Sequence, residues 1–186
     1  MQNFVAKKAI DYLSNELDTK INLKSIYFKP FKSLVIEGLE IYTPEGKKIV
    51  RSEIIEASVN LSQLIELNKV VINKLKIENT ESNFEQFKDS SNISFLIGYF
   101  NPPKKEKTKS SKKIVFDIKE LIINNNSFNY VNHKQKHFNK VVDFGDLGIS
   151  QLNAHFKNIK IDSNRISADI TSFNLKEKKA KLDELY

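Results

Sequence analysis

The sequence predicts a mainly β protein built on one curved, mostly antiparallel sheet. Three observations support this fold class. Hydrophobic residues make up 40% of the 186 residues, which is enough apolar surface for a folded core. From residue 21 onward, short runs rich in Ile, Val and Tyr alternate with turn segments that contain Pro or Gly, such as 29–32 and 43–48. One unusual spacing of apolar residues also recurs along these runs.

The segment "VVINKLKIEN" at 70–79 shows this spacing most clearly. Its apolar residues step by two, then by three, then by two again. A regular strand repeats every two residues and a helix every three or four, so neither period fits the whole segment. A strand with one extra residue in the middle fits it, because such a β-bulge keeps both halves of the strand facing the same side. Bulges also bend and twist a strand, so repeated bulges predict a curved sheet.

The same pattern recurs at Leu34, Ile36, Leu39 and Ile41, and at Phe116, Ile118, Leu121 and Ile123. Windows beginning at residues 21, 154 and 168 carry it as well. Asn79 and Asn125 each lie four residues beyond the Leu that follows the proposed bulge, so the windows at 70 and 116 also continue alike.

The remaining elements are assigned by their periodicity. An amphipathic helix is predicted near 3–17, because apolar residues recur at helical spacing between charged ones. A short helix is expected at 61–68, and residues 82–100 fit either a strand followed by a helix or two strands. We expect four parts: the N-terminal helix at 1–20, a first β segment at 21–100, a flexible loop at 101–113 and a second β segment at 114–186.

Net charge and cysteine content limit the possible partners. The net charge is +7, and six lysines crowd "NPPKKEKTKSSKK" at 101–113, which we interpret as a solvated loop, with contact to lipid phosphates as the alternative. The absence of Cys excludes disulfides and thiolate metal sites, and leaves both cytosol and periplasm possible. The sequence shows neither a run of about 18 apolar residues nor the pattern of a signal peptide.

A curved sheet with one apolar face must bury that face, and few helices are predicted to cover it. Either the sheet closes into a barrel or sandwich, or it stays a half-open groove whose apolar side is filled by a ligand or lipid. Periodicity alone favours ordinary closure.

A family resemblance favours the groove. It is carried by the short segments Ala6-Lys7-Lys8, Tyr12-Leu13-Ser14, Glu16-Leu17 and Thr19-Lys20, and by Gly38 and Gly46. The order of "LNKVVINKLKIEN", "NISFLIGYF", the lysine-rich segment and "FDIKELIINNNSFNY" carries it further along the chain, whereas Asp18 stands where the family usually has Gly. These features resemble the segment that follows the membrane anchor in the TamB family. TamB is the inner-membrane subunit of the translocation and assembly module, and is an AsmA-like protein.

The resemblance implies a non-enzymatic, periplasmic β-groove anchored to the bacterial inner membrane by a segment outside this chain. It implies that the groove conducts phospholipid between the inner and outer membranes. It also implies support of outer-membrane protein assembly with an outer-membrane β-barrel partner, through parts absent here. On this basis the concave face is expected to be lined by apolar residues that either bind lipid or form ordinary core: Leu34, Ile36, Leu39, Ile41, Val59, Val70, Ile72, Leu75, Ile77, Phe116, Ile118, Leu121 and Ile123.

No catalytic or cofactor site is predicted. His133 and His137 have the spacing of a metal-binding pair on a helix, but they lie in a polar segment typical of a turn, with Lys134 where metalloproteases carry Glu. The glycines are scattered and form no phosphate-binding loop. The alternative function is a closed β domain that binds single-stranded nucleic acid or another anionic partner, because Phe128 and Tyr130 lie near basic residues. Their place in the apolar alternation favours an inward, core role for both.

Overall fold

The computed structural model describes residues 10–12, 14–29, 33–59, 69–100, 115–136, 142–161 and 166–178. It contains eight strands and the short helix α2 (Ser94–Phe100) within these ranges. The strands are β1 (Ile21–Asn22), β2 (Ser25–Lys29), β3 (Ser33–Tyr42), β4 (Lys48–Val59), β5 (Lys69–Gln86), β6 (Val115–Asn132), β7 (Asp146–Ile161) and β8 (Ile166–Glu177).

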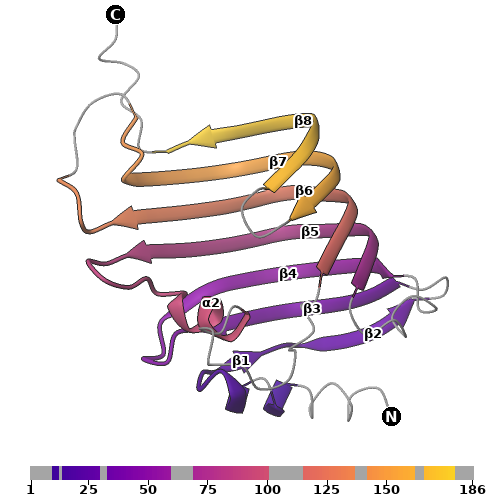
Figure 1. Cartoon of the computed structure of the whole chain (residues 1–186), viewed down its shortest axis with the longest axis horizontal. Coiled ribbons are helices and arrows are strands. Elements are labelled where there is room, and N and C mark those ends of the chain that lie inside the picture. Colours follow the sequence, from indigo (N-terminus) through magenta and orange to yellow (C-terminus); the bar gives the residue numbers. More distant parts are fainter. Residues whose placement is uncertain are drawn as a thin grey trace, which may run out of the picture.

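All eight strands belong to one sheet that does not close. The order is β1-β3-β4-β5-β6-β7-β8, and β2 continues the edge by pairing with β3. No pairing in the described chain joins β8 to β1 or β2, so the sheet has two free edges (Figure 1). The prediction of a mainly β, curved and half-open sheet is therefore confirmed.

One pair of strands departs from the antiparallel pattern. β5 and β6 run parallel, and every paired residue in β6 lies 46 positions after its partner in β5, from Lys69↔Val115 to Gln86↔Asn132. Parallel neighbours need a crossover connection, because a tight hairpin joins only antiparallel strands. Here the connection contains α2, and it begins with an isolated bridge between Gln86 and Ser91. The ambiguous segment 82–100 is thus a strand followed by a helix.

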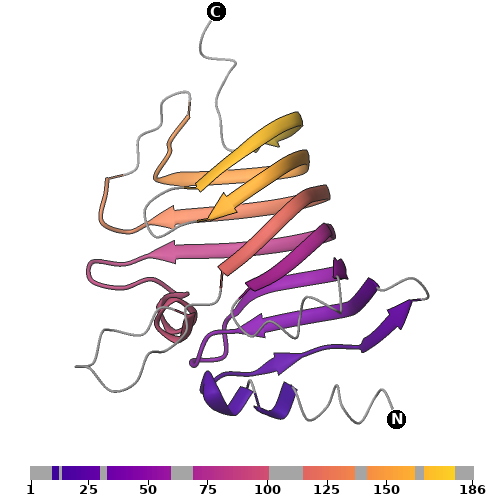
Figure 2. The ribbon, with the colours of Figure 1, turned by 45° about the vertical axis from the view of Figure 1, so that its right-hand side comes forward.

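The long strands bend sharply, which gives the sheet its curvature (Figures 1 and 2). One line of bends crosses the sheet where the backbone takes a positive φ at Gly38 (62°), Asn79 (48°) and Asn125 (50°). Gln151 (50°) continues the line in β7. Gly takes this left-handed conformation freely and Asn tolerates it better than most other residues, which explains why these residue types recur there.

A second line of irregularities matches the predicted bulges. β4 shifts register between Ser58 and Val59, whose partners are Lys74 and Ile72, so Asn73 is an extra residue in β5. Asn158, in β7, has a φ of 53° at the corresponding step of its own window. The bulge inferred from "VVINKLKIEN" is therefore present where the spacing placed it.

The helical predictions have mixed outcomes. Residues 10–12 and 14–16 are helical and lie beside β1 at the N-terminal edge of the sheet (Figure 1). The chain leaves this helix through a turn in which Leu17 and Thr19 are buried. Residues 3–9 and 13 of the predicted 3–17 helix, the expected helix at 61–68 and the lysine-rich loop at 101–113 lie outside the described residues.

Few large apolar side chains are fully buried in the described chain. Val35 and Ile49 are at most 1% exposed, whereas most apolar residues along the strands remain partly exposed. The strands form a single layer, with α2 on the side toward which β5 to β8 fold (Figures 1 and 2). Within the part of the chain that the structure describes, a single layer leaves much of an apolar sheet face without cover from another element.

Candidate functional site

The register of the sheet aligns apolar residues into rows that run across the strands. Directly paired residues point to the same face, so each row follows from the pairing of successive strands. The row through Leu75, called here the Leu75 row, consists of Phe28, Leu34, Ala57, Leu75, Leu121, Phe156 and Ile170. The adjacent Ile77 row consists of Ile26, Ile36, Ile55, Ile77, Ile123, Ala154 and Phe173.

These two rows form a continuous uncharged track from β2 to β8. Seven strands at a spacing of about 4.8 Å give the track a length of about 29 Å. Its interior residues are half-buried, apart from the buried Ala154. At its ends Phe28, Ile170 and Phe173 are 54%, 66% and 55% exposed. The track is therefore an apolar surface that stays partly exposed on every strand, apart from Ala154 in β7.

The bends place this track on the concave face. The register between β6 and β7 shifts from Ile123↔Ala154 to Asn126↔Leu152, which puts the two residues of β6 between these pairs on the opposite side of the sheet. Their parallel neighbours in β5, Glu78 and Asn79, therefore lie opposite to Ile77 and Thr80. Because two residues occupy that side, the longer backbone path and hence the outside of the bend lie there. Exposure agrees: Asn79 and Asn125 are exposed, whereas Ser52 and Asn126, beside the bends on the other side, are 1% and 8% exposed.

All thirteen predicted lining positions fall on this one face by register. The two rows contain Leu34, Leu75 and Leu121, and Ile36, Ile77 and Ile123. Beside these rows, Ile72 pairs with Val59 and Ile118, and Val70 pairs with Phe116. Leu39 and Ile41 lie on the other side of the bend in β3. The side chains of Val59, Val70 and Phe116 lie outside the described residues, and the other ten are half-buried. Whether lipid touches any of them stays a prediction.

A polar row interrupts the apolar face at the inside of the bend. This Thr80 row consists of Leu39, Ser52, Thr80, Asn126 and Leu152. The Ser52 and Thr80 hydroxyl oxygens lie 2.6 Å apart, and the Thr80 backbone N–H donates to Asn126 Oδ1 over 2.9 Å. The apolar windows could not reveal this row, because they record only hydrophobic positions.

Beyond the polar row the face becomes apolar and aromatic again. The Phe128 row consists of Ile21, Ile41, Val50, Ser82, Phe128 and Ile149. Phe84 packs edge-to-face on Phe128 at a centroid distance of 5.5 Å, and Phe84 pairs with Tyr130 in the parallel register. Phe128 and Tyr130 thus share the concave face with the apolar rows, as the alternation indicated.

The convex face carries compensated charges. Lys29 Nζ lies 2.7 Å from Glu56 Oε2. Lys74 Nζ and His155 Nε2 lie 3.3 Å and 2.8 Å from the carboxylate of Glu120. The hydrogen bond from Lys29 lowers the pKa of Glu56 below its ordinary value. Charge is therefore paired on one face while the described side chains of the two apolar rows carry none.

The bend itself is bound together by a ladder of polar side chains. Asn79 Nδ2 donates to Glu53 Oε2 over 2.6 Å, and Asn125 Nδ2 donates to Asn79 Oδ1 over 2.8 Å. In the next strand Asn153 Oδ1 accepts from the Asn125 backbone N–H over 2.9 Å. The ladder links β4 to β7 along the bend and holds the curvature of the groove.

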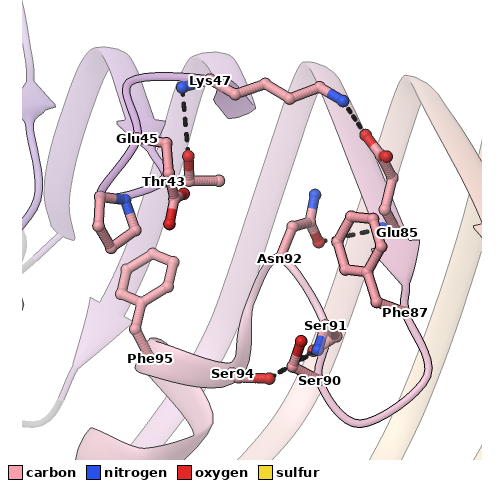
Figure 3. Close-up of a pocket in the computed structure, with 11 residues that line it drawn as sticks. Thr43, Glu45, Lys47, Glu85, Phe87, Ser90, Ser91, Asn92, Ser94 and Phe95 are labelled. Atoms are coloured by element: carbon pink, nitrogen blue, oxygen red, sulfur yellow. Dashed lines mark hydrogen bonds and ion pairs between the residues drawn. The ribbon is translucent and has the colours of Figure 1, made fainter.

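A separate pocket lies at the end of the strands, between the β3–β4 hairpin and the segment that leads into α2 (Figure 3). Lys47 reaches across it to Glu85, which also accepts a hydrogen bond from His133 Nε2 over 3.0 Å. The hydrogen bond from Lys47, followed by the weaker effect of the one from His133, lowers the pKa of Glu85 below its ordinary value. The ring of Phe87 stacks on that of His133 at a centroid distance of 5.0 Å. Lys47 and His133 are thus both bound to Glu85, and these contacts join the β3–β4 hairpin to the ends of β5 and β6, so we interpret the pocket as a structural junction.

Nothing in the described ranges forms a metal centre: no group of three or more His, Asp or Glu residues there could hold an ion. His133 binds Glu85 in the junction, and His137 lies outside the described residues. No helix in the described parts of the chain is long and apolar enough to cross a membrane. Comparison with known proteins found no family model that matches this chain and no curated protein that matches it.

Proposed function

We propose that this chain is a non-enzymatic groove that binds phospholipid acyl chains and conducts them between the inner and outer membranes of a bacterial envelope. The observation that carries the proposal is the pair of apolar rows, uncharged and partly exposed from β2 to β8. Monomeric proteins rarely expose contiguous apolar surface of this extent unless it binds something. A concave shape favours an elongated apolar ligand over a flat partner.

The dimensions and energetics suit a lipid tail. One leaflet of a bilayer contributes about 15 Å of hydrocarbon, so a track of about 29 Å could hold a tail at more than one position. Each methylene group removed from water contributes about 0.8 kcal/mol. Because successive strands repeat the same apolar surface, a tail moving along the rows would exchange one set of equivalent contacts for the next.

The proposal extends to place and partners through the sequence resemblance. A groove of this kind would work in the periplasm, tethered to the inner membrane by an anchor outside this chain. It would support outer-membrane protein assembly together with a β-barrel partner.

Nucleic-acid binding is the competing function, and the charge distribution argues against it. Single-strand binders place cations along the surface on which bases stack. Here the described side chains of the two apolar rows have no charge, and Lys29, Lys74 and Lys76 on the convex face each pair with a carboxylate. A salt series separates the two functions: nucleic-acid affinity falls steeply with ionic strength, whereas a lipid tail in an apolar groove stays bound.

The direct test replaces Leu75 and Ile77 together with Asp and measures co-purifying lipid by mass spectrometry. Two charges at these half-buried positions would repel hydrocarbon, so we expect bound phospholipid to disappear while the circular dichroism of the sheet is kept. The matched control places Asp at Ile54 and Ile122, half-buried positions on the convex face, and should keep its lipid. Phospholipid retained by the groove variant, or lost equally from both, would refute the proposal. Unfolding of the groove variant alone would show that these positions are ordinary core.

A further inference from the structure

Asn126 has an unused hydrogen-bond donor on the inside of the bend. Its side chain is 8% exposed and lies on the concave face, between the Ile77 row and the Phe128 row. Its Oδ1 accepts the Thr80 backbone N–H over 2.9 Å. Because that partner can only donate, the other terminal atom must be the amide nitrogen. Asn126 Nδ2 has no hydrogen-bond partner among the residues that the structure describes.

The surroundings define what this donor would bind. Apolar side chains flank it along its own strand, with Ile123 on one side and Phe128 on the other. No fully buried polar side-chain atom in the described chain lacks a partner, so Asn126 Nδ2 keeps some contact with solvent and can be reached from the groove. Because most of the side chain is already buried, an acceptor that arrives together with apolar surface displaces few water contacts. The described members of the Thr80 row and its two neighbouring rows carry no charge, so no cation there would neutralise a carboxylate or phosphate. An uncharged acceptor is therefore favoured.

We propose that Asn126 Nδ2 donates a hydrogen bond to the ester carbonyl of a glycerolipid whose acyl chain lies along the Ile77 row. This inference rests on the proposed function and refines it: the groove would select ester-linked acyl lipids at the bend. Adjacent inward-facing residues of a strand are about 7 Å apart, so the carbonyl at the start of a tail can sit at Asn126 while the tail follows the neighbouring row. Asn126 would then set the register of the lipid in the groove.

The test compares two ligands that differ only in the carbonyl. Binding is measured by displacement of a fluorescent lipid, using a diacyl phosphatidylcholine and its dialkyl ether analogue with equal chain lengths. One net hydrogen bond corresponds to about three- to tenfold in Kd, so the wild-type chain should prefer the ester by that factor. Asn126→Leu, which keeps the size of the side chain but removes the donor, should bind both ligands with equal affinity.

Two further variants separate binding from folding. Asn126→Asp retains an acceptor for the Thr80 N–H but lacks the donor, so it should also lose the ester preference. Asn129→Leu makes the same chemical change on the opposite face, where Asn129 Nδ2 donates to Asn83 Oδ1 over 2.8 Å, and should keep the preference. Equal affinity of the wild-type chain for both ligands, or an ester preference that persists in Asn126→Leu, overturns the role of Asn126 and leaves the groove proposal standing. Absence of binding to either ligand overturns both.

Discussion

Truncation of Phe173 should separate the stability of the sheet from its affinity for lipid. Phe173 ends the Ile77 row on β8, is 55% exposed and packs edge-to-face on Phe156 at a centroid distance of 6.4 Å. An aromatic side chain buries about 200 Å² when fully covered, so Phe173 leaves about 110 Å² available to a ligand. At about 25 cal/mol per Å², covering this area is worth at most about 2.7 kcal/mol. Ordering of the lipid offsets part of it, so we expect Phe173→Ala to weaken binding about 5- to 20-fold.

The reference for stability is Ile49, which is 0% exposed. Ile49→Ala should cost about 2–5 kcal/mol of unfolding free energy, as truncations of buried aliphatic residues do. Phe173→Ala should cost only about 1–2 kcal/mol, because it removes less than half of a buried aromatic surface. The assay is urea unfolding followed by circular dichroism, alongside displacement of a fluorescent lipid at a concentration of urea where each variant is folded. If Phe173→Ala lost as much stability as Ile49→Ala and bound lipid normally, the apolar rows would be core and the reasoning would fail.

Three other substitutions probe the bend and the convex face. Gly38→Ala should lower the free energy of unfolding in urea by about 1–2 kcal/mol, because the residue has a φ of +62° and the new Cβ would lie 2.9 Å from Lys24 Cβ. A variant as stable as the wild type would contradict this. Asn125→Gly should be about 1 kcal/mol more stable than Asn125→Ala in the same assay, because both variants lose the hydrogen bond to Asn79 but only Gly adopts the positive φ without cost. Equal unfolding midpoints would show that the backbone of residue 125 is not strained. The hydrogen bond from Lys48, with lesser help from neighbouring groups, lowers the pKa of Glu40 from 4.5 to about 2. A lowered folded pKa stabilises the fold above about pH 4.5, and this contribution disappears as the pH falls toward 2, so Glu40→Gln should flatten the pH dependence of stability in that window. Identical pH profiles for variant and wild type would show that solvent screens the pair completely.

The curvature of the sheet was predictable because a bulge leaves a mark in the sequence. The three-residue step between Ile72 and Leu75 predicted one extra residue, and the register places Asn73 there. Gly38 lies in the three-residue step between Ile36 and Leu39, where the strand bends at a positive φ but keeps its register with β4. The alternation on both sides of each step sufficed to put all thirteen lining candidates on one face, because side-chain direction in a strand depends only on parity once bulges are counted.

Pairing between strands was not predictable, because parity says nothing about which strands are neighbours. The parallel alignment of β5 with β6 depends on a crossover that no local pattern records. The polar Thr80 row was not predictable for the same reason, because Ser52, Thr80 and Asn126 lie far apart in the chain and are brought together only by the pairing of the strands. Their hydrogen bonds satisfy most of their polar groups, which is why an apolar face tolerates them.

The parallel pairing of β5 with β6 also predicts an order in which the parts of this sheet fold. Each side of that seam is dominated by antiparallel neighbours close in sequence, whereas closing the seam joins residues 46 positions apart across the connection that carries α2. Loop-closure entropy opposes such long-range contacts until much of the sheet has formed. We therefore expect strands β1–β5 and strands β6–β8 to form first, and the pairing of β5 with β6 to form last. Pulsed hydrogen exchange should then show amides of β3 and β4 protected before those that pair β5 with β6, and simultaneous protection would exclude this order.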